Sequence, residues 1–262
     1  MTVSIIGAGN LAWHLVNVFE ELDVRVAEVY ARKKKNAESI TGYLYDVNVK
    51  TDLDFSDSPS KLFVLAVSDD AIEIVAKQII LPNDSILVHT SGAKGMDVLN
   101  FAKFQNLSLN VGVFYPLMTF SKGIKVDFKL IPLCIEAENE SSLKILRKLA
   151  LSISDKVDVI DSEQRVILHV AAVFSCNFTN HMWALGKEIA DDAALDFEML
   201  KPLINETFKK AMKAVHPANV QTGPAVRDDF STIEKHRNII KEDEELLRVY
   251  DSLTKSIQDW YQ

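Results

Sequence analysis

VSIIGAGNLA, residues 3–12, is a short apolar strand followed at once by a glycine-rich turn. The turn has the pattern Gly-x-Gly-x-x-Ala at Gly7, Gly9 and Ala12. In a dinucleotide-binding turn the first glycine permits the sharp bend, the second lets the backbone approach a pyrophosphate, and the third small residue lets the helix pack on the strand. The alternative is a glycine-rich turn without a ligand, but apolar residues recur at helical spacing over residues 11–22, as the motif requires. The residues expected to hold the diphosphate are Gly7, Ala8, Gly9, Asn10 and Leu11.

The composition is that of a globular protein. With 262 residues, 48% of them hydrophobic, the chain can build one large core or two ordinary ones. No apolar run approaches the roughly 20 residues that span a bilayer, and a strand that begins at Val3 leaves no room for a signal peptide. We therefore expect a cytoplasmic protein without a membrane partner. The net charge of −8 argues against nucleic acid as a partner, because phosphate binding relies on clustered Lys and Arg.

The two cysteines, Cys134 and Cys176, both lie in apolar runs. We expect them to be reduced core residues, and we expect no metal site and no disulfide.

The first 160 residues alternate strand-like and helix-like segments, which is the pattern of helices around a mostly parallel sheet. Strands are expected at 3–6, 24–31, 62–67, 85–89, 110–114, 130–136 and 156–160, and helices at 10–22, 71–80 and 141–151, the last capped by Ser141 or Ser142. Beyond residue 162 only long amphipathic runs remain, at 163–191, 197–215, 225–233 and 241–260.

This pattern predicts the fold class α/β: a Rossmann-like, mostly parallel sheet domain at residues 1–161, followed by an all-α domain at residues 162–262. Ligands of such sheets bind outside the carboxyl ends of the strands, so we expect the site in a cleft between the two domains. The last helical run is amphipathic and ends in Trp260 and Tyr261, which favours burial against a second subunit and hence a homodimer.

The end of the second strand, YARKKK at residues 30–35, indicates which dinucleotide binds. An acidic residue there binds the ribose hydroxyls of NAD, whereas basic side chains accept the 2′-phosphate of NADP. Arg32 stands close to the expected distance after Gly7, and no acidic residue follows it before Glu38. Glu28 fits the NAD spacing loosely, but we expect it to fall inside the strand. The basic run could also be a solvated helix start. We favour NADP, bound by Arg32 and Lys33.

Three later strand ends turn abruptly from apolar to small or polar residues: 67–70 (VSDD), 89–92 (HTSG) and 114–117 (FYPL). Amides and hydroxyls of such turns approach ribose and nicotinamide. As alternatives, Ser68, Asp69 and Ser91 could cap the following helices, and His89 could be a core histidine with its hydrogen bonds satisfied. The residues that we expect to contact the cofactor are Val67, Ser68, Asp69, Thr90 and Ser91.

The helix expected from residue 163 places a polar stripe among apolar residues. At helical spacing His169, Val173, Cys176, Asn177 and Asn180 share about one face. Because a buried Asn costs free energy unless it is hydrogen bonded, the stripe either faces the cleft or bonds to neighbouring helices. If it faces the cleft, His169 is the proton donor, since imidazole exchanges protons near neutral pH, and Asn177 orients the substrate.

Residues 222–228 (TGPAVRD) have the composition of a helix start, with Thr222 or Gly223 near the N-cap and Pro224 in the first turn. That interpretation does not explain Arg227, because a cation in a first turn opposes the helix dipole. Arg227 is therefore expected to bind a substrate anion as a bidentate partner, or else to pair with one of the two aspartates that follow it.

Over nearly its full length the chain resembles the family of NADP oxidoreductases in which a Rossmann-like domain precedes a helical domain of unknown function, DUF2520. The resemblance rests on residues 6–12 (IGAGNLA), 66–72 (AVSDDAI), 89–93 (HTSGA), 115–120 (YPLMTF), 169–178 (HVAAVFSCNF) and 222–228 (TGPAVRD). Two departures stand out. The family tends to have His-Pro in place of Tyr115-Pro116, and Arg-Gly-Asp in place of Arg227-Asp228-Asp229. If either position touches substrate, the substrate of this member is expected to differ.

The wider superfamily includes 6-phosphogluconate dehydrogenases and other β-hydroxyacid dehydrogenases, and pyrroline-5-carboxylate reductases. The hydroxyacid enzymes place a catalytic Lys and Asn on the helix that leaves the Rossmann domain. This chain has no Lys on that helix before Lys187, and His169 and Asn177 are the match there, so we do not transfer that mechanism; imine reduction remains open.

The resemblance implies a cytoplasmic, NADP-dependent oxidoreductase that transfers a hydride between the nicotinamide and a small molecule. The missing Lys fits a non-catalytic dinucleotide-binding sensor or assembly protein equally well. A deazaflavin as hydride partner is a third possibility.

Overall fold

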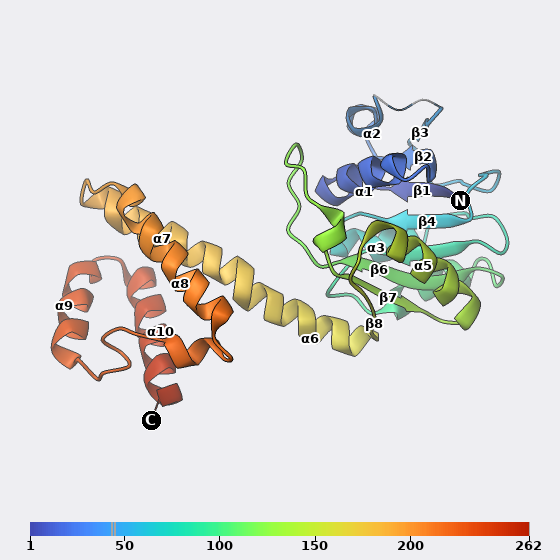
Figure 1. Ribbon diagram of the computed structural model, residues 1–262. Helices are drawn as coiled ribbons and strands as arrows, with labels where there is room; N and C mark the ends of the chain where they lie inside the picture. Colours follow the sequence, from blue (N-terminus) through green and yellow to red (C-terminus); the bar gives the residue numbers. More distant parts are fainter. Residues whose placement is uncertain (43, 45, 262) are drawn as a thin grey trace. The chain divides into compact units, whose positions relative to one another are not determined.

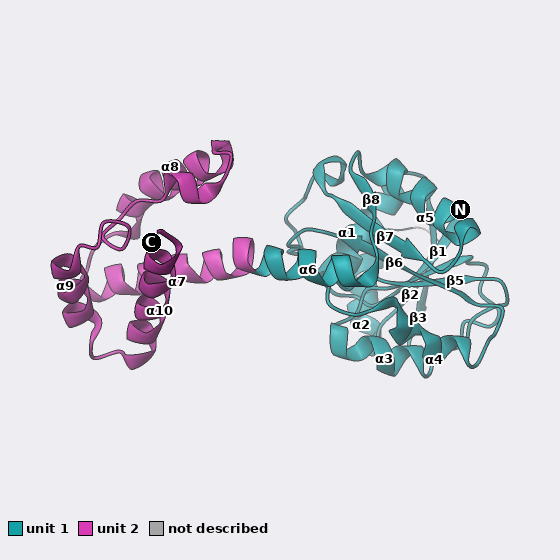
Figure 2. Ribbon diagram, turned by 90° about the horizontal axis from the view of Figure 1, so that it is seen from below, with its two compact units in different colours: residues 1–173 teal, residues 174–262 magenta. Residues whose placement is uncertain are grey.

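The structure is a computed structural model that describes residues 1–42, 44 and 46–261. It divides into two compact units, Met1–Val173 and Phe174–Gln262 (Figure 2). The division falls within the long helical segment that begins after residue 161, where we placed the domain boundary. The predicted boundary between residues 161 and 162 remains a proposal.

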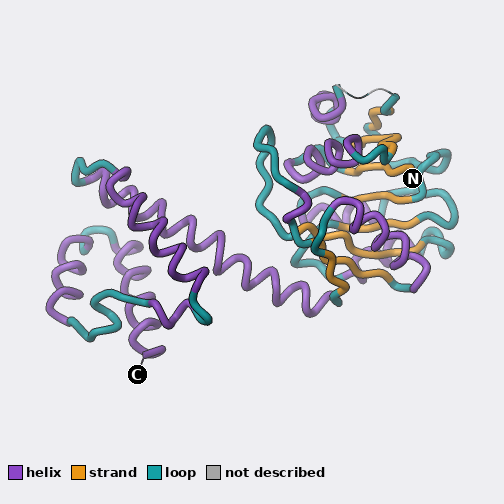
Figure 3. The backbone as a smooth tube through the Cα atoms, in the orientation of Figure 1, coloured by secondary structure: helices purple, strands orange, loops and turns teal. Residues whose placement is uncertain are grey.

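The first unit is built on one eight-stranded sheet in the order β3-β2-β1-β4-β5-β6-β7-β8, whose strands lie side by side in Figure 3. Neighbouring strands pair in parallel, except β6 and β7, which are antiparallel. The predicted α/β class with a mostly parallel sheet is therefore confirmed. The strands are β1 (Thr2–Ile6), β2 (Arg25–Tyr30), β3 (Asn48–Lys50), β4 (Leu62–Leu65), β5 (Ile86–His89), β6 (Asn110–Pro116), β7 (Leu133–Ala137) and β8 (Val157–Val159).

Helices cover both faces of this sheet (Figure 1). They are α1 (Asn10–Glu21), α2 (Lys34–Thr41), α3 (Asp69–Ala76), α4 (Asn100–Lys103) and α5 (Glu140–Ile153), with 3-10 turns η1 (Met96–Leu99) and η2 (Phe128–Leu130). Alternate residues of a strand point to opposite faces, so Ile5 packs in one apolar cluster with Leu15 of α1, and Ile6 packs in the other with Ile72 of α3. Burial on both faces explains why the central strands are continuous apolar runs.

Two local predictions in this unit were wrong. The sheet strand expected at 130–136 begins only at Leu133, because Pro132 has no N–H to donate to a strand ladder and η2 precedes it. Helix α5 is capped by the Asn139 side chain, which accepts from the Ser142 amide, and not by Ser141 or Ser142.

All the regular elements described after β8 are helices, as predicted. Helix α6 (Ser162–Ala172), a π-helical turn η3 (Val173–Phe178) and α7 (Thr179–Asp192) follow one another without a break. Then come η4 (Phe197–Leu200), α8 (Lys201–Lys213), η5 (Pro217–Val220), α9 (Phe230–Ile240) and α10 (Glu244–Tyr261). Among the described residues no helix has both the length and the apolar character that crossing a membrane requires.

The helix predicted at 225–233 is displaced. Residues 224–228 form turns, and α9 starts at Phe230 because the Asp229 side chain accepts from the Thr232 amide and provides the N-cap. The N-cap at Thr222 or Gly223 is thus wrong. One cysteine also differs from expectation: Cys134 is buried as predicted, whereas Cys176 is exposed.

Candidate functional site

The turn between β1 and α1 has a backbone that only glycine can adopt at its first position. Gly7 has φ of +130°, and a Cβ there would lie 2.1 Å from the carbonyl oxygen of Ala66. The Gly7 amide donates to the Tyr30 carbonyl at 2.9 Å, which fixes the turn against β2. A Cβ at Gly9 would meet no atom within 4 Å, so open space faces this residue.

No described side chain caps the backbone N–H groups at the amino end of α1. Gly9 is the N-cap without a side-chain cap, and the first turn contains no acidic residue. The first N–H groups of a helix have no acceptor within the helix, and the helix dipole favours an anion there. A loop brings a cation to the same turn, because the Lys122 ammonium donates to the Ala8 carbonyl at 2.8 Å. The side-chain Nδ2 of Asn10 donates to the Phe120 carbonyl of this loop at 3.0 Å.

A cleft of about 990 Å³ opens in front of this turn. The predicted cofactor residues that line it are Gly7, Ala8, Gly9, Asn10, Leu11, Arg32, Lys33, Val67, Ser68 and Thr90. Asp69 and Ser91 are not among its lining residues. The Ser91 hydroxyl instead accepts from the amides of Ala93 and Lys94, at 3.0 Å each, in the bend before η1. The N-cap of η1 is Gly95, so the alternative in which Ser91 caps that helix is wrong.

Several lining residues were not predicted: Tyr30, Ala31, Asn36, Leu53, Ala66, Ala71, Ile74, Val75 and Gln78. One of them, Ile74, is notable for its exposure in the structure. Ile74 lies in the middle of α3 and is 57% exposed, and a large apolar side chain left in the open beside a cleft is suited to an apolar ring of a ligand. Leu53 and Gln78 come from irregular segments whose sequence gives no comparable signal.

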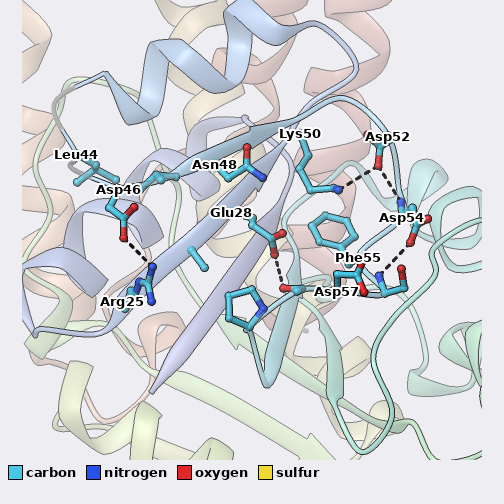
Figure 4. A pocket seen from close by; sticks show the side chains of 15 residues that line it. Arg25, Glu28, Leu44, Asp46, Asn48, Lys50, Asp52, Asp54, Phe55 and Asp57 are labelled. Carbon is cyan, nitrogen blue, oxygen red and sulfur yellow. Dashed lines mark hydrogen bonds and ion pairs between the residues drawn. The ribbon is translucent and has the colours of Figure 1, made fainter.

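Glu28, the acidic residue that could bind the ribose of NAD, does not line this cleft. The residue lies inside β2, as we expected, is only 6% exposed, and accepts hydrogen bonds from the hydroxyls of Ser4, at 2.6 Å, and Ser58. It lines a different cavity of about 900 Å³ beside β2 and β3, together with Arg25 and Lys50 (Figure 4). The two cavities share no lining residue, and the charged residues that line the cleft are Arg32 and Lys33.

Farther along the carboxyl edge of the sheet, three segments converge. Tyr115 near the end of β6 and His169 of α6 meet with 3.2 Å between the phenol oxygen and Nδ1, and their rings are nearly perpendicular. A Cβ at Gly92, in the turn after β5, would lie 2.7 Å from His169 Nδ1 and 2.7 Å from Tyr115 Cζ. Burial, together with the nearby Cys134 and Asp69, raises the pKa of Tyr115, so its phenol is protonated at neutral pH.

His89, at the end of β5, is a different kind of histidine. It is fully buried, its Nδ1 accepts from the Ser91 amide at 3.1 Å, and its Nε2 has no partner in the described part of the chain. Burial, and secondly the positive charge of Arg165, lower the pKa of His89 to about 3. It is therefore neutral at physiological pH, and it is only partly the satisfied core histidine that we considered.

One helical turn before His169 on α6, the buried Arg165 links α6 to β7 and to the segment after β5. Its guanidinium pairs with Glu136 of β7, donates to the Lys94 carbonyl at 2.6 Å and contacts the Ser162 hydroxyl at 3.1 Å. The same hydroxyl accepts from the Met96 amide at 3.0 Å. The start of α6 is thereby fastened to β7 and to the segment after β5.

Asn177 and Arg227 belong to the second unit, and both are exposed. The π-helical turn at Val173–Phe178 interrupts the 3.6-residue period, so the single face that we drew through His169 and Asn177 does not follow from helical spacing. Arg227 lies in the turns before α9 and not in a first helical turn, so the dipole argument for its role is wrong. Substrate roles for both residues stay predictions.

The fold and the glycine turn define a Rossmann-like protein, and comparisons with known proteins agree. The family model "Rossmann-like domain" matches residues 1–109, and "Domain of unknown function (DUF2520)" matches residues 131–257. No curated protein matches the chain in sequence.

Among solved structures, a Bacteroides fragilis protein provisionally named an NADP oxidoreductase is 36% identical, with 98% of each chain covered and a TM-score of 0.88. This chain belongs to the same family, in which a Rossmann-like domain precedes a DUF2520 domain. A reductive aminase from Aspergillus terreus in complex with NADPH shares the fold at 10% identity, with a TM-score of 0.74 and 100% and 99% of the two chains covered. An imine reductase from Streptomyces aurantiacus shares it at 14% identity, with a TM-score of 0.64 and 100% and 95% covered.

Proposed function

We propose that the protein is an NADP-dependent oxidoreductase that acts on a small molecule. The observation that carries this proposal is the cleft in front of Gly9, where unpartnered helix amides face open space and Arg32 and Lys33 line the wall. The glycine turn fits a dinucleotide diphosphate, because Gly7 packs directly against the Ala66 carbonyl and open space faces Gly9. The 36% identical relative from Bacteroides fragilis, provisionally named an NADP oxidoreductase, supports the same assignment.

The preference for NADP over NAD rests on charge. A 2′-phosphate adds a dianion next to the ribose, and Arg32 can bind it with two parallel hydrogen bonds. Glu28, the acidic residue that could have selected NAD, is turned into the other cavity. With a net charge of −8 over the whole chain, such an anion must be attracted by these local cations.

In this proposal the bound nicotinamide supplies the hydride, and the protein binds, orients and protonates. His169 is the proposed proton donor, Asn177 the residue that orients the substrate and Arg227 the residue that recognises an anionic group. The two segments nearest to His169, at Gly92 and Tyr115, also lie at the carboxyl edge of the sheet, where Rossmann-type ligands bind.

The first test compares NADPH and NADH by thermal shift. A ligand at 100 times its Kd stabilises the folded protein by about 2.7 kcal/mol. We expect stabilisation by NADPH at concentrations where NADH has little effect, and we expect Arg32→Ala to remove that difference while leaving the unliganded melting temperature unchanged. Equal stabilisation by the two nucleotides would contradict the role of Arg32.

The second test separates an enzyme from a sensor. Stereospecifically deuterated NADPH is incubated with the protein and a metabolite extract, and deuterium is followed into products by mass spectrometry. Incorporation that requires the protein and is lost in His169→Gln supports the oxidoreductase. Binding of NADPH without any transfer would favour the non-catalytic sensor or assembly protein.

We further propose that the protein is a homodimer, because the second unit buries few apolar side chains. Ala190, Ala225 and Ile233 are the buried hydrophobic residues of its described part. Large apolar side chains that stay more than 40% exposed include Phe174, Phe178, Trp183, Leu195, Met199, Leu203, Phe208, Met212, Val215, Phe230, Ile239 and Trp260. Exposed apolar surface of this extent marks an interaction face, and we assign it to a second copy of the chain. Light scattering after gel filtration tests this: a monomer at micromolar concentration would contradict it.

A further inference from the structure

The contact between Tyr115 and His169 is made possible by a glycine. The two side chains come from β6 and α6, 54 residues apart in the chain, and meet where a side chain on Gly92 would otherwise stand. The perpendicular rings bring the phenol oxygen to the edge of the imidazole, at Nδ1. A contact at this one atom affects which of the two ring nitrogens carries the proton.

The surroundings of the phenol favour it as the donor in this pair. The raised pKa keeps Tyr115 protonated, so its O–H needs an acceptor, and within the described residues His169 Nδ1 is the one partner that its oxygen has. The lone pair of a neutral imidazole nitrogen accepts that hydrogen well. The reverse arrangement, with Nδ1–H donating to the phenol, would leave the phenol hydrogen without a protein acceptor.

A neutral imidazole carries one proton, so an Nδ1 that accepts places the hydrogen on Nε2. Nε2 of His169 has no hydrogen-bond partner in the described part of the chain, and the residue is half-buried and not enclosed. This nitrogen is thus free to donate to a bound molecule.

We propose that Tyr115 is a positioning residue that holds His169 in the Nε2–H tautomer and directs that N–H toward the substrate. The proposal deepens the proposed function and rests on it, since it assigns a purpose to His169 as the proton donor. It also selects a substrate feature: the group protonated by Nε2–H must be an acceptor, such as a carbonyl oxygen or an imine nitrogen. Hydride addition to such a group leaves a negative charge on that oxygen or nitrogen. The charged atom takes the Nε2 proton while Nδ1 takes the phenol proton, so the imidazole stays neutral and Tyr115 then regains a proton from water.

The test uses nitrogen NMR of the full chain labelled at histidine, at a pH where the imidazoles are neutral, with His169→Gln to assign the resonances. The second unit supplies a matched control, because His236 Nδ1 and the Tyr250 hydroxyl form a similar pair at 2.9 Å with nearly perpendicular rings. In the unmodified protein we expect the His169 proton on Nε2. Tyr115→Phe is expected to lower the ratio of Nε2–H to Nδ1–H at His169 by about fivefold, which is the equilibrium value of one net hydrogen bond. Tyr250→Phe should change the His236 signals and leave those of His169 unchanged.

The activity measurement separates the two proposals. If deuteride transfer is found, Tyr115→Phe should lower kcat with little change in the KM for NADPH, since the phenol touches the donor and not the nucleotide. A His169 proton on Nδ1 in the unmodified protein, or signals that Tyr115→Phe does not shift, would overturn the positioning role whatever the activity. The predicted tautomer together with undiminished transfer in His169→Gln would retain the pair and refute His169 as the proton donor.

Discussion

Replacing Arg165 with methionine is expected to be among the most destabilising single changes in the first unit. The guanidinium is completely buried and is paired with Glu136, whose side chain is 16% exposed. Methionine fills much of the same volume but supplies no charge or donor. Among the described residues, Glu136 would keep the Ser162 hydroxyl as its one side-chain partner, and the Lys94 carbonyl would lose the Arg165 donor.

The magnitude follows from the unpaired carboxylate. Breaking a buried ion pair by removing one partner costs about 3–5 kcal/mol, because the remaining charge stays out of water. That is a large share of the roughly 5–15 kcal/mol that holds a typical domain folded. For a unit of this size it corresponds to a fall in Tm of roughly 6–20 °C.

Urea unfolding followed by circular dichroism measures the effect as a lower midpoint with an unchanged slope. The double variant Arg165→Met/Glu136→Leu should recover most of the loss, since removing both charges of a buried pair is often nearly neutral. Lys34→Met, which removes the exposed ion pair with Glu38, serves as the control and should leave the midpoint unchanged. If Arg165→Met cost no more than this control, or if the double variant were worse than the single one, the reasoning from the buried charge would be refuted.

Three further changes test the site and its surroundings. The pKa of His89 is about 3 in the folded protein and near 6.5 in the unfolded chain. As the pH falls below 6.5, the unfolded state binds a proton that the folded state does not, so the free energy of unfolding decreases. It should drop by roughly 1 kcal/mol from pH 7 to 5.5, and by about 1.4 kcal/mol for each further pH unit towards the folded pKa. Urea midpoints across this range measure it, and a His89→Gln curve as steep as that of the unmodified protein would assign the slope to other groups. Gly7→Ala places a methyl group 2.1 Å from the Ala66 carbonyl oxygen at a positive φ, so the glycine turn must shift. This should abolish the NADPH-dependent thermal shift and lower stability by at least about 1–3 kcal/mol. Retained NADPH binding would contradict the role of the glycine turn in holding the diphosphate. Gly92→Ala should separate the Tyr115 phenol from the His169 imidazole, because its methyl group would lie 2.7 Å from His169 Nδ1. The His169 tautomer ratio should then shift as it does in Tyr115→Phe, with NADPH binding retained. An unchanged NMR spectrum would show that the contact between Tyr115 and His169 tolerates the methyl group.

The sequence was informative where local chemistry and regular periodicity coincide. The glycine turn at Gly7 and Gly9, the central strands and the long C-terminal helices follow from apolar period and from the φ that only glycine allows. The edge strand β3 escaped prediction because its three residues are half-buried or exposed and show no period. Helix α2 begins at Lys34 within the basic run, where a solvated helix start was only the alternative to cofactor binding.

The side chains that meet across the fold could not be paired from the sequence. Tyr115 was visible as part of a strand end, and His169 as part of a helix, but their contact depends on the empty position at Gly92. Arg165 gave no signal, because an arginine on an amphipathic helix is usually solvated, and only the tertiary structure encloses it. The π-helical turn similarly depends on more than spacing.

Arg165 and His169 stand four residues apart on α6 and so project from the same face of that helix. The buried ion pair of Arg165 fixes the rotation of α6 about its axis against β7, and this rotation decides whether the imidazole one turn later reaches Tyr115. The two contacts therefore have different energetic roles: the first should account for stability and the second for the tautomer. Arg165→Met should then change both the urea midpoint and the His169 NMR signals, whereas Tyr115→Phe should change only the signals. If Arg165→Met lowered stability while leaving the His169 tautomer ratio intact, the rotation of α6 would be set by something other than this ion pair.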